Sequence, residues 1–389
     1  MSEPEVLLFT IDAGGGHRAA ARALAAAAEE TKAPFRLRVE SFQQTLIELD
    51  ILKRATGVSI EDGYNWILRR RWNVTMVPLL RLVHGAIRVR RPAIVRTLAG
   101  WLRRCRPRPA AVVSVMPNFN GVMRDAIREA IPETPLIVVL TDFADFPPRF
   151  WIEPGLDRVV VGSDEAREQA LALGIPPERV SRVSGMVMHP RFYRSGGPSV
   201  RDRVRGELGL GEADFAVTLL FGGKGSPEIA PLSERLLATD PAFRVIAICG
   251  DNPSLFERLG PLEARAGGRL VRLGFTDRVA ELLAASDLLV TKPGPGSLSE
   301  AFHQRVPVIV TRNIHTIPQE RFNTDFVRDR GLGLVVSGTR DIPAAAWRLF
   351  RDLPGRTAIR ERLSALPENR AVYEVIDIVA AHAHHQAHD

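Results

Sequence analysis

The chain has 389 residues, of which 45% are hydrophobic and 25% are charged, and a formal net charge of +7. This length exceeds the needs of one ordinary domain, and the composition excludes a largely disordered chain. No run of about 18 apolar residues occurs, so no membrane-spanning helix is expected. The first ten residues lack the features of a signal peptide. We expect Cys105 and Cys249 to be buried free thiols of a cytoplasmic protein.

In the N-terminal half, apolar segments of strand length alternate with segments of helix length. Strands are expected at 6–10, 35–39, 111–115, 136–140 and 158–161. Helices are expected at 17–30, 119–131 and 164–173, and most of 43–106 should also be helical. Such alternation predicts a parallel, doubly wound sheet.

Positive charge is concentrated between residues 50 and 109, where Lys and Arg far outnumber Asp and Glu. Tryptophans are interleaved with the arginines, a mixture that suits an anionic membrane surface. We predict a membrane-facing segment there, with Trp66, Arg69, Arg70, Arg71 and Trp72 as its contacts. A solvated basic surface is the alternative. Nucleic acid is disfavoured because no recognisable binding module accompanies the charge.

Two prolines and two glycines in residues 186–198 interrupt the alternation and indicate an interdomain linker. A second alternating series follows, with strands expected at 215–220, 244–248, 270–272, 288–290, 306–310 and 333–336. We therefore predict an α/β protein of two Rossmann-like domains, 1–187 and 201–370, joined by a linker at 188–200. A terminal helix and a His-rich tail are expected at 371–389. Ligands of such proteins bind at the carboxyl ends of the strands, which here would face a cleft between the two domains.

The most informative segment is 288–310. A strand runs into Pro293-Gly294-Pro295-Gly296, and a helix is expected to open at Ser297 with Glu300 in its first turn. Backbone N–H groups at a helix N-terminus bind anions, and a carboxylate one turn later can accept hydrogen bonds from adjacent sugar hydroxyls. The pattern favours a nucleotide-sugar site. The alternative is a capping box, in which Ser297 caps the helix and Glu300 returns to the cap amide.

Two further motifs follow strands of the second series. The turn at 221–226 contains Gly222 and Gly223, which let backbone amides approach an oxyanion, and Lys224, which adds a positive charge. Its spacing is not that of a Walker A loop. Gln319 and Glu320 follow Pro318 and offer hydrogen-bonding groups for sugar hydroxyls. Their alternative is an ordinary first turn of a helix.

In the first series, Gly14, Gly15 and Gly16 lead from the first strand into His17. The positive end of a helix dipole disfavours imidazolium, so a histidine there suits a neutral general base. Asp142 ends another strand of the same half, where it could orient His17 or assist it. The alternatives are a structural histidine and a turn-capping carboxylate.

Together these motifs resemble the GT-B glycosyltransferases, and more closely the group of monogalactosyldiacylglycerol synthases and processive diacylglycerol glucosyltransferases. The lipid-linked N-acetylglucosaminyltransferase of cell-wall synthesis is a more distant relative of that group. The segments that carry the resemblance are GGGH at 14–17, TDF at 141–143, the run 159–180, FGG at 221–223, GFTDRVAELLAASDLLVTKPGPGSLSEA at 274–301 and PQERFN at 318–323.

The resemblance implies inverting, metal-independent transfer of a hexose from a UDP-sugar to a hydroxyl of a membrane lipid such as diacylglycerol. It implies no cofactor, only the UDP-sugar as co-substrate, and a location on the inner face of the cell membrane. By it, His17 and Asp142 are catalytic, and Gly14, Gly15 and Gly16 form an acceptor-side loop. By the resemblance, Gly222 and Gly223 approach the diphosphate, Phe275 lies by the uracil, Glu300 takes the ribose, and Gln319 and Glu320 take the hexose. The residue pattern adds Lys224, Gly294, Gly296 and Ser297 to the predicted donor site. The alternatives are transfer to a soluble small molecule and a UDP-sugar epimerase or hydrolase on the same fold.

Overall fold

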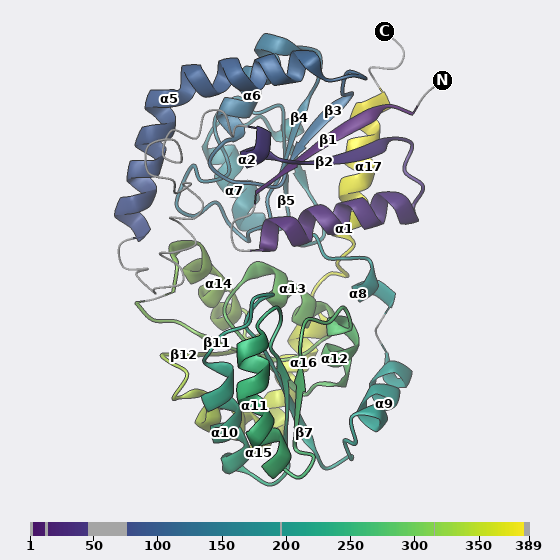
Figure 1. Cartoon of the computed structure of the whole chain (residues 1–389), viewed down its shortest axis with the longest axis vertical. Helices are drawn as coiled ribbons and strands as arrows, with labels where there is room; N and C mark the ends of the chain where they lie inside the picture. The colour runs from purple at the N-terminus through teal and green to yellow at the C-terminus, as the bar shows by residue number, and fades with distance from the viewer. Residues whose placement is uncertain (1–2, 12–14, 46–75, 195–196, 315, 385–389) are drawn as a thin grey trace. The chain divides into compact units, whose positions relative to one another are not determined.

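The computed structural model describes residues 3–11, 15–45, 76–194, 197–314 and 316–384 (Figure 1). The chain divides into two compact units, and each is considered by itself. Unit 1 comprises Met1–Pro190, Ile317–Gln319 and Asn369–Asp389, and unit 2 comprises Arg191–Thr316 and Glu320–Glu368. Both units combine a parallel sheet with helices, which confirms the predicted α/β fold class.

Unit 1 is built on a six-stranded parallel sheet in the order β2-β1-β3-β4-β5-β6. Its strands are β1 (Glu5–Thr10), β2 (Arg36–Ser41), β3 (Ala111–Ser114), β4 (Leu136–Val139), β5 (Arg158–Val161) and β6 (Val180–Arg182). β1, β3 and β4 are buried throughout, which explains their nearly continuous apolar sequences. β6 has three residues and was not predicted, because Val-Ser-Arg after a Pro-Pro pair carries almost no strand signal.

The helices of unit 1 cover both faces of this sheet. In the described part of the unit they are α1 (Gly16–Glu30), α2 (Phe42–Thr45), α5 (Met76–Arg104), α6 (Asn120–Ala130), α7 (Asp164–Ala172), the 3-10 turn η3 (Pro177–Arg179) and α17 (Ala371–His384). α1 and α17 pack side by side on one face, and α5 packs with α6 on the other (Figure 1). Crossovers between parallel strands are right-handed, so the direction in which the next strand is added decides which face the connecting helix covers. The step from β1 to β2 runs in one direction along the sheet, and the steps from β3 to β6 run in the other, so their helices cover opposite faces.

Unit 2 repeats the architecture with the strand order β12-β11-β10-β7-β8-β9. Its strands are β7 (Phe215–Leu220), β8 (Phe243–Ile248), β9 (Leu270–Leu273), β10 (Leu288–Thr291), β11 (Val308–Thr311) and β12 (Gly333–Val336). Its helices are α8 (Arg191–Arg194), α9 (Pro198–Glu207), α10 (Ile229–Thr239), α11 (Pro253–Arg265), α12 (Val279–Ala285), α13 (Pro295–His303), α15 (Ile342–Arg351), α16 (Leu353–Ser364) and, from Glu320 onward, α14 (Pro318–Asp329). α8 and the start of α9 lie in the segment predicted as a linker.

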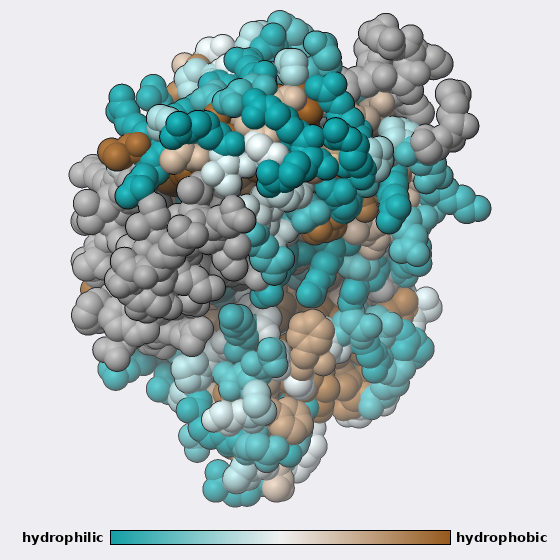
Figure 2. Space-filling view, turned by 45° about the horizontal axis from the view of Figure 1, so that its top comes forward, coloured by the Kyte–Doolittle hydropathy of each residue, from teal (hydrophilic) through white to brown (hydrophobic). Residues whose placement is uncertain are grey.

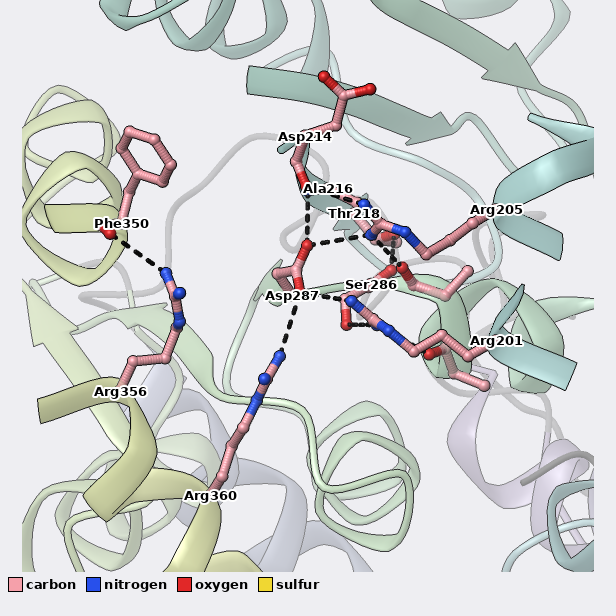
Figure 3. Close-up of polar contacts among 12 residues, drawn as sticks. Arg201, Arg205, Asp214, Ala216, Thr218, Ser286, Asp287, Phe350, Arg356 and Arg360 are labelled. Atoms are coloured by element: carbon pink, nitrogen blue, oxygen red, sulfur yellow. Dashed lines mark hydrogen bonds and ion pairs between the residues drawn. The ribbon is translucent and has the colours of Figure 1, made fainter. Parts of the chain in front are cut away.

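A buried carboxylate, Asp287, ties several elements of unit 2 together at the amino end of β10 (Figure 3). Its Oδ1 accepts from Arg201 at 2.6 Å and Arg360 at 3.1 Å, and its Oδ2 accepts from Arg205 at 3.2 Å and the Ala216 N–H at 3.0 Å. Burial alone would raise the pKa of Asp287, but Arg201, the Ala216 N–H and Arg205 outweigh it and hold that pKa below its usual range. The carboxylate therefore anchors α9, β7 and α16.

The surface mixes polar and apolar residues, and Figure 2 shows hydrophobic residues exposed between hydrophilic ones on the face that it presents. The large hydrophobic side chains exposed among the described residues are Val39, Val89, Phe146, Phe275, Ile314, Trp347 and Leu353. Cys105 and Cys249 are buried and free, as predicted. Within the described ranges, no helix is long and apolar enough to cross a membrane.

Candidate functional site

The predicted donor residues of unit 2 cluster at the point where the strand order reverses. β7 pairs with β8 on one side and with β10 on the other, so the loops after β7 and β10 leave neighbouring strands in diverging directions. Open α/β sheets bind ligands at this switch point, at the carboxyl ends of the strands. The loops that follow β7 and β10, together with α13, contain all but three of the predicted donor residues.

The turn after β7 has a fixed shape that only glycine permits at two positions. Gly222 has a φ of 84° and Gly225 a φ of 62°. A Cβ on Gly225 would lie 2.1 Å from the carbonyl oxygen of Cys249, so this position has no room for a side chain. The Gly225 N–H donates to the Gly222 carbonyl at 3.0 Å. Lys224 is exposed between the glycines of this turn.

The helix after β10 begins earlier than predicted. α13 starts at Pro295 with Gly294 as its N-cap, and no side chain caps it. The capping-box alternative is therefore wrong: Ser297 is the third helical residue, and Glu300 lies in the second turn instead of the first. Pro295 favours this start because its fixed φ suits the first helical position. The N–H groups of Gly296 and Ser297 belong to the first turn, where backbone donors have no partner within the helix.

Glu300 lies on α13, and although it retains some exposed surface its carboxyl is largely desolvated. Burial raises the pKa of Glu300 to about 7, and the positive charge of Arg191 opposes that shift. Arg191 also donates to the carbonyl of Asp277 at 2.9 Å, in the loop that follows β9. Phe275 lies in the same loop and is 71% exposed, which leaves its ring free to stack on a ligand. Arg191 thus bonds to the loop after β9 and acts on Glu300 through its positive charge.

Lys292, which the sequence analysis did not single out, lies among these loops. Its Nζ is 3.0 Å from Oε1 of Glu320, near the start of α14. Its Cε lies 3.6 Å from the position that a Cβ would take on Gly222 and on Gly294. One feature of the sequence could have identified Lys292: it stands directly between a buried strand and the glycine-containing turn at 293–296.

Buried polar atoms without a partner accompany this lysine. Within the described residues, no hydrogen bond reaches Oγ1 of Thr291, Oδ1 of Asn323 or Oε1 of Gln319. Asn323 is fully buried and uses its amide nitrogen to bind the Pro293 carbonyl at 2.8 Å. Buried polar groups are normally satisfied, so the orphaned oxygens of Thr291 and Asn323, both in unit 2, indicate a place where a ligand or water completes the bonding.

In unit 1, His17 is the second residue of α1, after a left-handed Gly15 with a φ of 85°. Burial lowers the pKa of His17 to about 4, and a hydrogen bond with the Val115 backbone opposes that shift. The imidazole is therefore neutral at pH 7, as a general base requires. Its Nδ1 lies 3.3 Å from Oγ1 of Thr141 at the end of β4, a partner that the sequence analysis did not name.

Asp142 is buried, and its Oδ2 accepts from the indole N–H of Trp151 at 2.8 Å. The Trp151 ring centroid lies 5.6 Å from that of His17. Trp151 is itself fully buried, and its backbone N–H donates to Asp145 at 2.7 Å. The loop after β4 thus supplies one buried aromatic side chain that bonds Asp142 and lies beside His17. The predicted residues Gly14, Trp66, Arg69, Arg70, Arg71 and Trp72 lie outside the described residues.

Comparison with known proteins supports the resemblance inferred from the motifs. Residues 93–187 match the family model for monogalactosyldiacylglycerol (MGDG) synthase. The chain is 29% identical over 347 residues to the probable chloroplastic monogalactosyldiacylglycerol synthase of Nicotiana tabacum, covering 85% of this chain and 62% of that protein. It is 31% identical over 221 residues to the processive diacylglycerol beta-glucosyltransferase of Bacillus subtilis (strain 168), covering 56% of this chain and 55% of that protein. The chain thus spans less than two thirds of either relative, and its predicted similarity to this group is confirmed.

Solved structures match the complete fold at low sequence identity. Anabaena Alr3699/HepE in complex with UDP-glucose has a TM-score of 0.53 at 16% identity, covering 98% of this chain and 99% of that one. Arabidopsis thaliana UGT89C1 complexed with quercetin has a TM-score of 0.62 at 17% identity, covering 98% of this chain and 100% of that one. At these identities the similarity shows the fold alone, and it confirms the predicted GT-B fold.

Proposed function

We propose that this chain is a glycosyltransferase that moves a hexose from a UDP-sugar to a hydroxyl of a membrane lipid such as diacylglycerol. The observation that carries the proposal is the tobacco match, which covers 85% of the chain and therefore includes sequence from both units. That relative is named for the synthesis of a galactosyl diacylglycerol, and the Bacillus relative for glucosyl transfer to diacylglycerol.

The donor is proposed to bind at the switch point of unit 2. The backbone N–H groups of the β7 turn and of the first turn of α13 would receive the diphosphate, and Lys224 would add positive charge. Phe275 would stack on the uracil, and Glu300 would accept from the ribose hydroxyls. Gln319 and Glu320 would hold the hexose. The orphaned oxygens of Thr291 and Asn323 support a polar ligand at this edge.

His17 is proposed to act as the base. It would take the proton from the acceptor hydroxyl, whose oxygen attacks the anomeric carbon as the bond to the UDP oxygen breaks. Attack opposite the leaving group would invert the anomeric centre. Asp142 would help to fix the base. Negative charge grows on the departing diphosphate, where amides and cations of unit 2 would stabilise it without a bound metal ion.

The acceptor side is proposed to work at an anionic membrane surface, on the inner face of the cell membrane. α5 supports this: its described part carries the exposed side chains of Arg88, Val89 and Arg90, and Val89 is 79% exposed. An exposed apolar side chain between cations suits the boundary between lipid headgroups and acyl chains. The predicted contacts at 66–72 precede α5 in the sequence.

The test is UDP release from UDP-glucose, UDP-galactose and UDP-N-acetylglucosamine, with and without vesicles that contain diacylglycerol and an anionic lipid. We expect release that requires these vesicles, survives EDTA and is lost in His17→Ala. General-base catalysis contributes roughly 10²–10⁴-fold, which sets the expected loss. A glycolipid product of inverted configuration would complete the proof.

Two other outcomes would contradict the proposal. Release without vesicles, unaffected by diacylglycerol, would instead indicate a UDP-sugar hydrolase or epimerase. Release that depends on a soluble alcohol but not on lipid would indicate a small-molecule acceptor. If release did not require vesicles, the proposed lipid acceptor would be wrong, while the proposed UDP-sugar donor would stand.

A further inference from the structure

One ammonium group stands where three donor segments of unit 2 meet. Lys292 directly follows β10, next to the turn after β7, since Thr291 pairs with Leu220 in the sheet. Its Cε lies 3.6 Å from the position of a Cβ on Gly222 and on Gly294, so a side chain larger than alanine at either glycine would crowd the lysine. Lys292 is therefore a cation to which both glycine turns leave access.

The partner of Lys292 is also a predicted donor residue. Its Nζ lies 3.0 Å from Oε1 of Glu320, and the two side chains differ in exposure, at 46% for Lys292 and 12% for Glu320. An ion pair with a half-exposed lysine contributes little to stability, so a ligand can replace it at small cost. Glu320, in contrast, is largely buried near the start of α14. Of the two side chains, the lysine is thus the one with solvent around it and room to change partner.

We propose that Lys292 binds the diphosphate of the donor, and that Glu320 holds Lys292 until the donor arrives. This inference rests on the proposed function. In the free protein the ammonium pairs with Glu320, and in the complex it pairs with phosphate oxygens. The exchange leaves the Glu320 carboxylate available to accept from a sugar hydroxyl. Recognition of the phosphates and of the sugar is thereby coupled through one ion pair.

The orphaned oxygens fit this exchange. Thr291 immediately precedes Lys292, and Asn323 holds the carbonyl of Pro293, the residue after Lys292. Both side chains are completely buried, and each keeps one oxygen without a hydrogen bond from the described residues. The backbone on either side of Lys292 is therefore fixed, while the nearby oxygens of Thr291 and Asn323 can still accept a hydrogen bond. A rigid base with a movable ammonium suits a phosphate-binding lysine.

Binding of three ligands to the full chain tests the inference: uridine, UDP and the UDP-sugar that supports activity. Lys292→Met should weaken UDP binding by about 10- to 100-fold and leave uridine binding unchanged, because only UDP carries phosphates. Lys292→Arg should restore part of the loss. Arg235→Met, which removes an exposed positive charge from α10, is the matched control and should bind all three ligands as the wild type does.

Glu320→Gln tests the exchange itself. Without the competing carboxylate, UDP should bind as tightly as to the wild type or several-fold more tightly. If the UDP-sugar binds the wild type more tightly than UDP does, that advantage should disappear in the variant. Weaker UDP binding in Glu320→Gln would overturn the exchange. An unchanged ratio of UDP to uridine affinity in Lys292→Met would overturn the assignment of Lys292 alone. A wild-type protein that binds neither uridine nor UDP would refute the proposed function, and this inference with it. Thermal melting of each variant checks that it is folded.

Discussion

Protonation of Glu300 should control nucleoside binding near neutral pH. Burial raises the pKa of this carboxyl to about 7 in the free protein. Ribose hydroxyls donate to an ionised carboxylate more strongly than to a protonated one, because hydrogen bonds to charged acceptors are the stronger ones. Uridine should therefore bind to the ionised form. Its affinity should rise with pH through about 7 and level off above pH 8.

The size of the effect follows from the same pKa. A carboxyl with a pKa of about 7 is roughly one-tenth ionised at pH 6 and nine-tenths ionised at pH 8, so uridine affinity should change about tenfold between them. Stability should move in the opposite direction. Because the folded-state pKa lies above the ordinary glutamate pKa of 4.5, stability is present at low pH and is lost as pH rises from about 4.5 to about 7. At 1.36 kcal/mol per pKa unit, the loss reaches about 3 kcal/mol.

The assay is calorimetric titration with uridine at pH 6, 7 and 8, paired with urea unfolding between about pH 4.5 and pH 8. Uridine is preferred to UDP because its binding involves no titrating phosphate. Glu300→Gln cannot ionise, so it should bind uridine weakly at every pH and be more stable than the wild type at pH 8. Uridine affinity that falls with rising pH, or a pH dependence that persists in Glu300→Gln, would refute this reasoning.

Three further substitutions test other parts of the structure. Asp287→Asn should lower the free energy of unfolding by about 3 kcal/mol at pH 7, because it leaves Arg205 buried without its counter-charge. The pKa of Asp287 is lowered, so the difference in unfolding free energy between wild type and variant should shrink below about pH 4. Equal urea midpoints of the two proteins at pH 7 would contradict a stabilising role of Asp287. Thr141→Val removes the hydroxyl beside His17 and should reduce kcat about 3- to 10-fold with little change in KM, whereas a change confined to KM would mean that Thr141 does not position the base. Val89→Asp on α5 should weaken binding to anionic vesicles about tenfold in a sedimentation assay and spare uridine binding, and unchanged sedimentation would remove this residue from the membrane contact.

Most of the sheet architecture was predictable, because buried parallel strands appear as short apolar runs between turn signals. The strands at 158–161, 215–220 and 333–336 were predicted with the bounds that the structure gives. β6 was missed because it adds three residues at an edge, where pairing with β5 and not its own composition makes it a strand. The start of α13 was placed two residues late, since Ser297 offers a capping signal that Gly294 and Pro295 override through backbone geometry.

The site was less predictable than the sheets. Motifs identify which loops reach the carboxyl edge, but they do not show which side chains approach one another there. His17 was singled out by its place after three glycines, whereas its contact with Thr141 depends on how β4 lies two strands away from β1. Lys292 was overlooked because lysine after a strand is common, and only the pairing of β10 with β7 brings it beside Gly222.

The last helix sets the order in which the chain can finish folding on the ribosome. α17 supplies Val372, Val375, Ile376 and Val379 to the interior of unit 1, where it packs on α1 and β3. Chains are made from the N-terminus, yet unit 1 stays incomplete until residue 384 has emerged. Unit 2, which ends at residue 368, has all its elements available earlier. The unit that is synthesised first is thus completed last. Until α17 has been made, the apolar side of α1 stays uncovered and can bind chaperones or associate wrongly with other chains.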